Sequence, residues 1–238
     1  MANKYFQFKQ FTIQQDKCAM KVCTDACLFG AYVADELQHL FAANILDIGS
    51  GTGLLSLMLA QKTSALIDTV EINEAAFIQA KENIQQSPWK ENITVYNTDI
   101  IQFESGKKYD CIISNPPFFE ADLQSADKSK NAAKHDTTLT LQQLLQNIER
   151  LLSSNGFFAV LLPYHRSIYF EAESKKLDFH LAKKILVKQT PKHDYFRVML
   201  IFSRKESVTK KGEIIIKNNG GDYSEEFKGL LKDYYLYL

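Results

Sequence analysis

The chain has 238 residues, of which 45% are hydrophobic, 12% aromatic and 24% charged, which is enough for one substantial domain. No apolar run approaches the roughly 20 residues that are needed to span a bilayer. The first residues also lack the apolar region of a secretory signal peptide. We therefore expect a cytoplasmic protein with no membrane partner.

The formal net charge is zero, but the charge is spread unevenly along the chain. Residues 1–150 hold 13 Lys/Arg and 18 Asp/Glu, whereas residues 151–238 hold 15 and 10, so the two parts carry −5 and +5. A basic part is compatible with a phosphate backbone as partner, although a solvated surface gives the same asymmetry. The four cysteines, Cys18, Cys23, Cys27 and Cys111, form no C-x-x-C pair. Reduced core thiols are therefore favoured over a metal site built on Cys23, Cys27 and a distant His.

The elements expected in chain order begin with one or two short strands within residues 4–22, which form an N-terminal extension. A helix follows from a cap at Thr24 or Asp25 to about Leu40. Strands and helices then alternate: strands at 44–48, 65–70, 93–96, 109–113 and 157–162, and helices at 54–61, 74–85, 139–152 and 165–177. Asn73 caps the second of these helices, and Asn155-Gly156 closes the helix that begins at 139.

Two long β-like runs, 180–188 and 195–204, end this series. Only a turn signal lies between them, which is too short for a crossover helix, so the two strands are antiparallel. The tail mixes charged residues with isoleucines and tyrosines and is expected to add a strand plus a helix. The predicted fold is therefore α/β: a doubly wound, mostly parallel sheet with one reversed strand near its edge. We expect a single domain over 1–238, with 1–23 as a β extension and 207–238 as an appendage.

A glycine-rich segment, 49–53, lies between a predicted strand and a predicted helix. Gly49, Gly51 and Gly53 let the backbone approach a ligand closely. The pattern is G-x-G-x-G, which differs from the dinucleotide fingerprint, and it lacks the Lys-Ser/Thr end of a P-loop. Glu71 ends the next strand, where a carboxylate can accept both hydroxyls of a ribose. Asp47, just before the glycines, would help to hold a cationic sulfonium ligand.

A second motif, Asn115-Pro116-Pro117-Phe118, follows the predicted strand 109–113. The Asn115 side-chain oxygen and the Pro116 carbonyl can accept both hydrogens of a planar exocyclic amine, whose lone pair is then able to attack. Phe118 offers a flat face on which a base can stack. An ordinary strand-ending turn is the alternative interpretation, because Asn-Pro is common turn chemistry.

Together these motifs resemble those of a known enzyme family. Leu46-Asp47-Ile48-Gly49-Ser50-Gly51-Thr52-Gly53 is similar to the first motif of class I methyltransferases that use S-adenosylmethionine, and 115–118 is similar to the fourth motif of the amino-methyltransferase branch. The resemblance implies that the glycine loop holds the cofactor, that Glu71 takes its ribose and that Asp99 holds its adenine amine. It also implies a seven-stranded sheet whose last strand is the reversed one.

The N-terminal segments indicate one particular branch of this enzyme family. Phe8-Lys9-Gln10-Phe11, residues 18–22 and residues 24–32 resemble the N-terminal signature of bacterial tRNA(Val) adenine methyltransferases, although Cys23 stands where a glycine is more usual. Those enzymes methylate the N6 amine of the adenine next to the anticodon. The resemblance implies that Thr24 and Asp25 enclose the methionine end of the cofactor. We expect a monomer with tRNA as partner and no metal.

Candidate RNA-binding residues are the cations near the second motif and around the predicted hairpin. The first set is Lys128, Lys130, Lys134 and His135, and the second is Lys183, Lys184, Lys188, Lys192, His193 and Arg197. His165 and Arg166 open the helix after the fifth strand, where phosphate binding is a further possibility. For each residue taken singly, a solvated surface is the simpler interpretation.

Three other functions fit the same motifs. One is methylation of a guanine N2 amine in ribosomal RNA, and another is methylation of a glutamine amide in a protein. The protein enzymes usually carry Tyr after the prolines and a helical N-terminal domain, and this chain has neither. The third is a non-catalytic RNA-binding module, against which the intact glycine loop and Asn115 argue. DNA adenine methylation is disfavoured because there is no separate target-recognition domain.

Overall fold

The structure is a computed structural model that describes residues 3–18, 20–40, 42–116 and 139–238. Its strands are β1 (Tyr5–Gln7), β2 (Thr12–Gln14), β3 (Asn44–Ile48), β4 (Leu66–Glu71), β5 (Ile93–Asn97), β6 (Tyr109–Ser114), β7 (Leu152–Pro163), β8 (His180–Lys188), β9 (Tyr195–Ser203) and β10 (Lys210–Ile215). Its helices are α1 (Thr24–Leu37), α2 (Leu54–Ala60), α3 (Glu74–Gln85), α5 (Leu141–Leu151), α6 (Ser167–Lys176) and α7 (Glu225–Leu231), with a 3-10 turn η1 (Tyr164–Arg166) before α6. The N-terminal strands, β1 and β2, pair with each other as a separate antiparallel hairpin.

The other strands form one twisted sheet in the order β10-β8-β9-β7-β6-β3-β4-β5. All neighbouring pairs are parallel except those that involve β9, which runs antiparallel to both β7 and β8. The reversed strand predicted near the edge is thus confirmed. The carboxyl ends of β3, β4, β5, β6, β7 and β8 consequently share one edge of the sheet, which is where open α/β sheets bind ligands.

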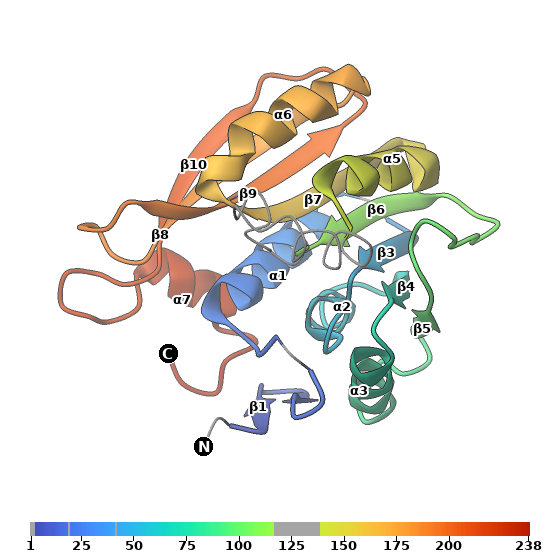
Figure 1. Cartoon of the computed structure of the whole chain (residues 1–238). Helices are drawn as coiled ribbons and strands as arrows, with labels where there is room; N and C mark the ends of the chain where they lie inside the picture. The colour runs from blue at the N-terminus through green and yellow to red at the C-terminus, as the bar shows by residue number, and fades with distance from the viewer. Residues whose placement is uncertain (1–2, 19, 41, 117–138) are drawn as a thin grey trace, which may run out of the picture.

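Helices cover both faces of the sheet, as Figure 1 shows with α5 and α6 on one side and α1, α2 and α7 on the other. Alternate residues of each central strand enter opposite cores, because successive side chains of a strand point to opposite faces. On β3, Ile45 joins the core beneath α1 and α2, and Leu46 joins the core beneath α5. This doubly wound arrangement explains why the central strands are apolar on both faces.

One predicted helix cap is confirmed, and another is wrong. The Asn73 side chain accepts a hydrogen bond from the backbone N–H of Ala76 and so caps α3. Thr140 and Gln143 form a reciprocal capping box at the start of α5. The prediction that Thr24 or Asp25 caps α1 is wrong, because the N-cap is Cys23 and no side chain caps it.

The prediction that Asn155-Gly156 closes the helix after residue 139 is also wrong. Helix α5 ends at Leu151, and β7 starts at Leu152 without a connecting loop. Gly156 serves strand packing instead, since an added Cβ would lie 3.0 Å from the Tyr109 carbonyl oxygen and 2.9 Å from the Leu152 side chain. The glycine lets β7 approach β6 closely, where the pairing register shifts.

The tail forms the expected strand and helix, β10 and α7. Strand β10 pairs in parallel with β8 and becomes an eighth strand of the large sheet, where the resemblance implied seven. Helix α7 buries Phe227 and Leu231 in the core beneath α1. The tail is thus an integral layer of the fold.

The N-terminal and C-terminal segments meet. The backbone N–H of Lys9 donates to the Tyr234 carbonyl at 2.8 Å, and Phe8 forms an isolated bridge with Tyr235. The Phe8 ring stacks on Phe11 at 4.5 Å between centroids. These contacts hold the N-terminal hairpin against the body of the protein.

Candidate active site

The glycine turn and the Asn-Pro motif lie side by side at the carboxyl edge of the sheet. Strands β3 and β6 are neighbours, with Ile48 opposite Ser114. The Ser114 hydroxyl donates to the Ile48 carbonyl oxygen at 2.9 Å and fixes this register. Gly49 and Asn115 each follow directly after these paired residues, so the two predicted motifs occupy adjacent strand ends.

The glycine turn adopts a backbone that side chains rarely allow. Gly49, Gly51 and Gly53 have φ values of 75°, 55° and 80°. A Cβ built on Gly49 or Gly51 would meet no atom within 4 Å among the described residues, so open space lies beside both. The turn is held by the Gly49 N–H, which donates to the Val70 carbonyl at 2.9 Å. The result is a backbone cradle that the described residues leave open.

Glu71 closes one side of this cradle. Its carboxylate accepts hydrogen bonds from the Gly51 N–H and from the Asn73 N–H, both at 2.8 Å, and its side chain is buried. Each oxygen therefore uses one lone pair on the backbone and keeps another for a ligand hydroxyl. The Asn97 amide donates to the Glu71 carbonyl at 2.9 Å and ties the end of β5 to the end of β4.

Asp47 lies beneath the cradle with an exposed fraction of 0%. One carboxylate oxygen accepts a hydrogen bond from the Ser56 hydroxyl at 2.7 Å, and the other has no partner among the described residues. Burial raises the pKa of Asp47 to about 7, against the smaller lowering effect of the Ser56 contact. A cation placed near this carboxyl would favour its charged form.

Asn115 is half-buried, and its side-chain oxygen is buried without a hydrogen-bond partner among the described residues. A buried amide oxygen with no donor is costly, and such groups in folded proteins normally have a partner. Pro116 is buried next to it. Pro117 and Phe118 lie outside the described residues. The strand end therefore presents an acceptor that a ligand N–H can satisfy.

The other predicted cofactor residues lie around this edge. Asp99 is half-buried after β5, where its carboxylate accepts from the Ile101 N–H at 2.9 Å. Thr24 and Asp25 form the first turn of α1. Asp25 makes an ion pair with Arg197 of β9 at 2.8 Å, so α1 is tied to the reversed strand.

Asn83 is a residue that the sequence did not single out. Its amide, with an exposed fraction of 1%, donates to the carbonyls of Thr52 and Gln14 and accepts from the Gln14 N–H, each at 2.9 Å. One side chain therefore joins the glycine turn to the N-terminal hairpin. In the sequence, only the position of Asn83 among the buried residues of α3 could have indicated this role, because its hydrogen-bond partners come from two distant segments of the chain.

The second predicted basic set is largely paired with carboxylates. Lys183, Lys184 and Lys188 contact Glu36, Glu171 and Glu213 at 2.5, 2.6 and 3.5 Å. Lys192 and His193 lie on the exposed turn between β8 and β9, where His193 contacts Thr190. His165 and Arg166 belong to η1. The first set, Lys128, Lys130, Lys134 and His135, lies outside the described residues.

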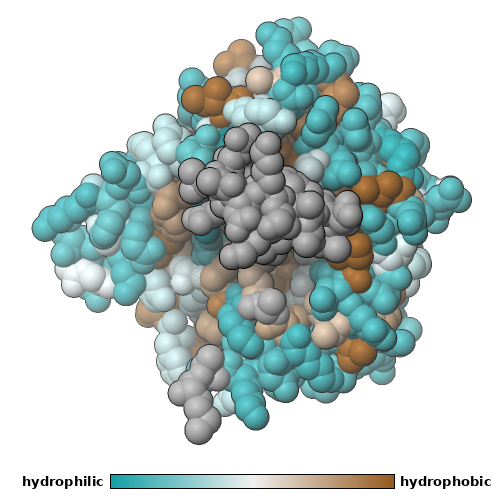
Figure 2. Space-filling model, viewed as in Figure 1, coloured by the Kyte–Doolittle hydropathy of each residue, from teal (hydrophilic) through white to brown (hydrophobic). Residues whose placement is uncertain are grey.

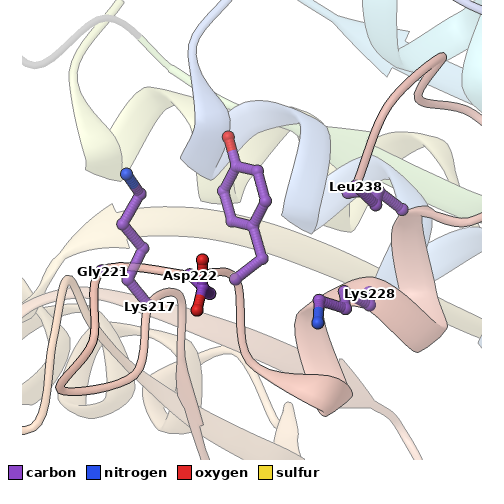
Figure 3. Close-up of a pocket in the computed structure, with 6 residues that line it drawn as sticks. Lys217, Gly221, Asp222, Lys228 and Leu238 are labelled. Carbon is purple, nitrogen blue, oxygen red and sulfur yellow. The ribbon is translucent and has the colours of Figure 1, made fainter.

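A cavity of about 290 Å³ lies elsewhere, between the loop after β10, helix α7 and the C-terminal residue. Figure 3 shows Lys217 and Asp222 from the loop and Lys228 from the helix around it. None of the predicted site residues lines this cavity. Within the described part of the chain, no three His, Cys, Asp or Glu residues are grouped as a metal site would need. No helix there has the length and apolar character needed to cross a bilayer.

A doubly wound sheet with the reversed strand β9, a glycine turn after β3 and an acidic residue at the end of β4 is typical of class I methyltransferases. Residues 29–168 match the family model described as "Methyltransferase small domain". A predicted O-methyltransferase from Agrobacterium tumefaciens superposes with a TM-score of 0.68 at 16% identity and covers 88% of this chain and 96% of its own. Trm5b from Pyrococcus abyssi superposes with a TM-score of 0.60 at 14% identity and covers 85% and 56%.

Sequence relatives define the family more narrowly. The tRNA1(Val) (adenine(37)-N6)-methyltransferase of Dyadobacter fermentans is 43% identical over 239 residues and covers 98% of both chains. The enzyme of the same name from Bacteroides thetaiotaomicron is 39% identical and covers 100% of both chains. The chain therefore belongs to the tRNA1(Val) (adenine(37)-N6)-methyltransferase family, which confirms the resemblance found in its sequence.

Proposed function

We propose that this chain transfers a methyl group from S-adenosylmethionine to the N6 amine of adenine 37 in tRNA(Val). The observation that carries the proposal is the Asn115 side-chain oxygen, which is buried without a partner among the described residues beside the glycine turn. The relatives that share almost the whole chain bear the name of this activity. The partner is tRNA, and the location is the cytoplasm.

The residues at the strand ends fit the cofactor. The described residues leave space beside Gly49 and Gly51 for a ligand against the backbone, and a side chain at either position would enter that space. Glu71 has lone pairs left for ribose hydroxyls, and Asp99 lies at the next strand end for the adenine amine. Asp47 places a carboxyl with one unpartnered oxygen beneath the turn. When bound, S-adenosylmethionine supplies a methyl group activated by a sulfonium cation.

Asn115 and Pro116 prepare the nucleophile. An adenine amine is a poor nucleophile because its lone pair is delocalised into the ring. Hydrogen bonds from the amine to the Asn115 oxygen and the Pro116 carbonyl favour a tetrahedral nitrogen and stabilise the positive charge that develops on it. No strong base is needed, because the nitrogen loses its proton to water after the transfer. Positioning of the two reactants supplies much of the remaining rate gain.

The target base must leave its stack to reach Asn115, at a cost that is smaller in a loop than in a duplex. We assign Phe118 to stacking on this base. Lys128, Lys130, Lys134 and Lys192 are proposed to contact the RNA backbone. Arg197, which was predicted to do the same, is ion-paired with Asp25 and is better suited to positioning α1 over the cofactor.

The test uses the full-length chain, labelled S-adenosylmethionine and an unmodified tRNA(Val) transcript. Digestion to nucleosides should yield N6-methyladenosine from position 37. A methylated guanine or a methylated glutamine would instead favour one of the sister activities. No transfer to any RNA or protein would favour the non-catalytic module.

The Asn115→Ala variant tests the amide. We expect kcat to fall by about 10²–10³-fold, the range seen when one preorganised hydrogen-bonding group is removed. Binding of S-adenosylmethionine, measured by calorimetry, should survive. Asn219→Ala changes an exposed loop residue in the same way and serves as the control. Turnover near the parent rate in Asn115→Ala would remove the amide from the mechanism.

A further inference from the structure

The turn after β7 and the hairpin between β8 and β9 extend the carboxyl edge beyond the proposed catalytic centre. Val160 of β7 lies opposite Ser114, the residue before Asn115. Strand β7 continues to Pro163, which lies opposite Arg197 of β9. The η1 turn and the start of β9 consequently lie on the same side of the sheet as Asn115. A substrate that reaches Asn115 from this side passes over both segments.

Two tyrosines meet on this edge. The rings of Tyr164, from η1, and Tyr195, from the start of β9, lie 5.3 Å apart between centroids at an interplanar angle of 49°. Tyr164 has an exposed fraction of 40%, so part of its ring is open to solvent. Its ring is therefore available to a partner.

Tyr195 is held firmly by the tail strand β10. Its hydroxyl donates to the Glu213 carboxylate at 2.5 Å. The Lys188 ammonium lies 4.4 Å from the centroid of its ring and 3.5 Å from Glu213. These contacts hold the Tyr195 ring against which Tyr164 packs, so Tyr195 loses little conformational entropy when a substrate binds to the pair.

The surroundings of the pair are polar and carry charges of both signs, with His165 and Arg166 next to Tyr164 in η1. The turn between β8 and β9 and the loop after β10 project from the same side of the molecule and bond to each other from Lys217 N–H to the Gln189 carbonyl at 3.0 Å (Figure 1). This projection is mainly hydrophilic in the space-filling view (Figure 2). Exposed Lys192 is accompanied by exposed Asp194, and Lys188 is balanced by Glu213. The paired rings add a contact of another kind to this surface.

We propose that Tyr164, supported by Tyr195, forms a stacking platform for an unpaired nucleotide of the RNA that neighbours the target base. The inference rests on the proposed function, since it assigns part of the substrate of that same site. Every base has a flat π face, so an exposed aromatic ring binds unpaired nucleotides with little sequence preference. The platform holds the RNA strand while the target base turns toward Asn115.

The test measures binding of an unmodified tRNA(Val) transcript by fluorescence anisotropy, together with kcat and KM for methylation. Tyr164→Ala should raise the Kd and KM for RNA by about 5-fold or more, in the range that loss of one base–aromatic contact gives. The Kd for S-adenosylmethionine should not change. Tyr164→Phe keeps the ring and should bind RNA like the parent. Tyr237→Ala removes a tyrosine that is 87% exposed elsewhere and is the control.

The outcomes separate this inference from the proposed function. Unchanged RNA affinity in Tyr164→Ala overturns the platform, and so does an equal loss in Tyr164→Phe, which would implicate the hydroxyl. If the parent chain binds the transcript but does not methylate it, the proposed function is wrong. The RNA affinities of the parent and Tyr164→Ala still test whether Tyr164 forms a stacking platform. Because stacking is not a charge contact, the ratio of the two Kd values should hold as salt is raised.

Discussion

Replacement of Asp47 by Asn removes the buried carboxyl beneath the glycine turn. Burial raises its pKa to about 7 in the folded chain, from an ordinary value of 3.8. Between these two pH values the folded state binds more protons than the unfolded state, so the carboxyl lowers stability progressively as pH rises from about 4 to about 7. A shift of this size corresponds to about 4 kcal/mol. The free energy of unfolding of Asp47→Asn, measured relative to that of the parent, should therefore be higher at pH 8 than at pH 4.

Urea unfolding at several pH values measures this difference directly. The Asn oxygen still accepts from Ser56, so the variant keeps the hydrogen bond that anchors the side chain. Asp35→Asn, which changes an exposed carboxylate of α1, controls for the loss of one negative charge. If the stability difference between Asp47→Asn and the parent stays constant from pH 4 to pH 8, Asp47 is not the buried titrating group that the structure indicates.

Three further substitutions probe the elements that hold the site. Asn83→Ala should lower the free energy of unfolding in urea by about 3 kcal/mol, because it removes the three hydrogen bonds that this buried amide makes to Thr52 and Gln14; a change within experimental error would contradict that network. Gly51→Ala should cost about 1–2 kcal/mol through its φ of 55°, and calorimetry should show weaker S-adenosylmethionine binding, whereas an unchanged Kd would place the cofactor elsewhere. Thr140→Ala should cost about 1 kcal/mol by removing the cap of α5, and equal melting curves would show that the cap is dispensable.

Much of the fold could be predicted from local patterns. The parallel strands are short apolar runs, and their order along the chain sets a doubly wound sheet. Asn73 was identifiable as a cap because it directly precedes an amphipathic helix. Asn155-Gly156 was misassigned because a glycine after a helix is a common stop signal, whereas the space around Gly156 is determined by Tyr109 on another strand.

The arrangement of the site was partly predictable as well. Parallel strands bring their carboxyl ends to one edge, so the proximity of Gly49 and Asn115 follows once β3 and β6 are neighbours. The ion pairs of the basic residues could not be predicted from the sequence in the same way. Lys183 meets Glu36, which is 147 residues away in the chain, and this contact depends on how α1 lies over β8. The anchor of Tyr195 likewise depends on an eighth strand, β10.

The junction of Lys9 with Tyr234 has a practical consequence for anyone handling this protein. The segment after the last helix bonds to the N-terminal hairpin, the hairpin shares the Asn83 amide with Thr52, and Thr52 belongs to the glycine turn. We therefore expect purification tags or deletions at either terminus to change the affinity for the cofactor, because these contacts connect both termini to the glycine turn. An internal surface loop, such as the one around Asn219, is a safer position for a reporter group.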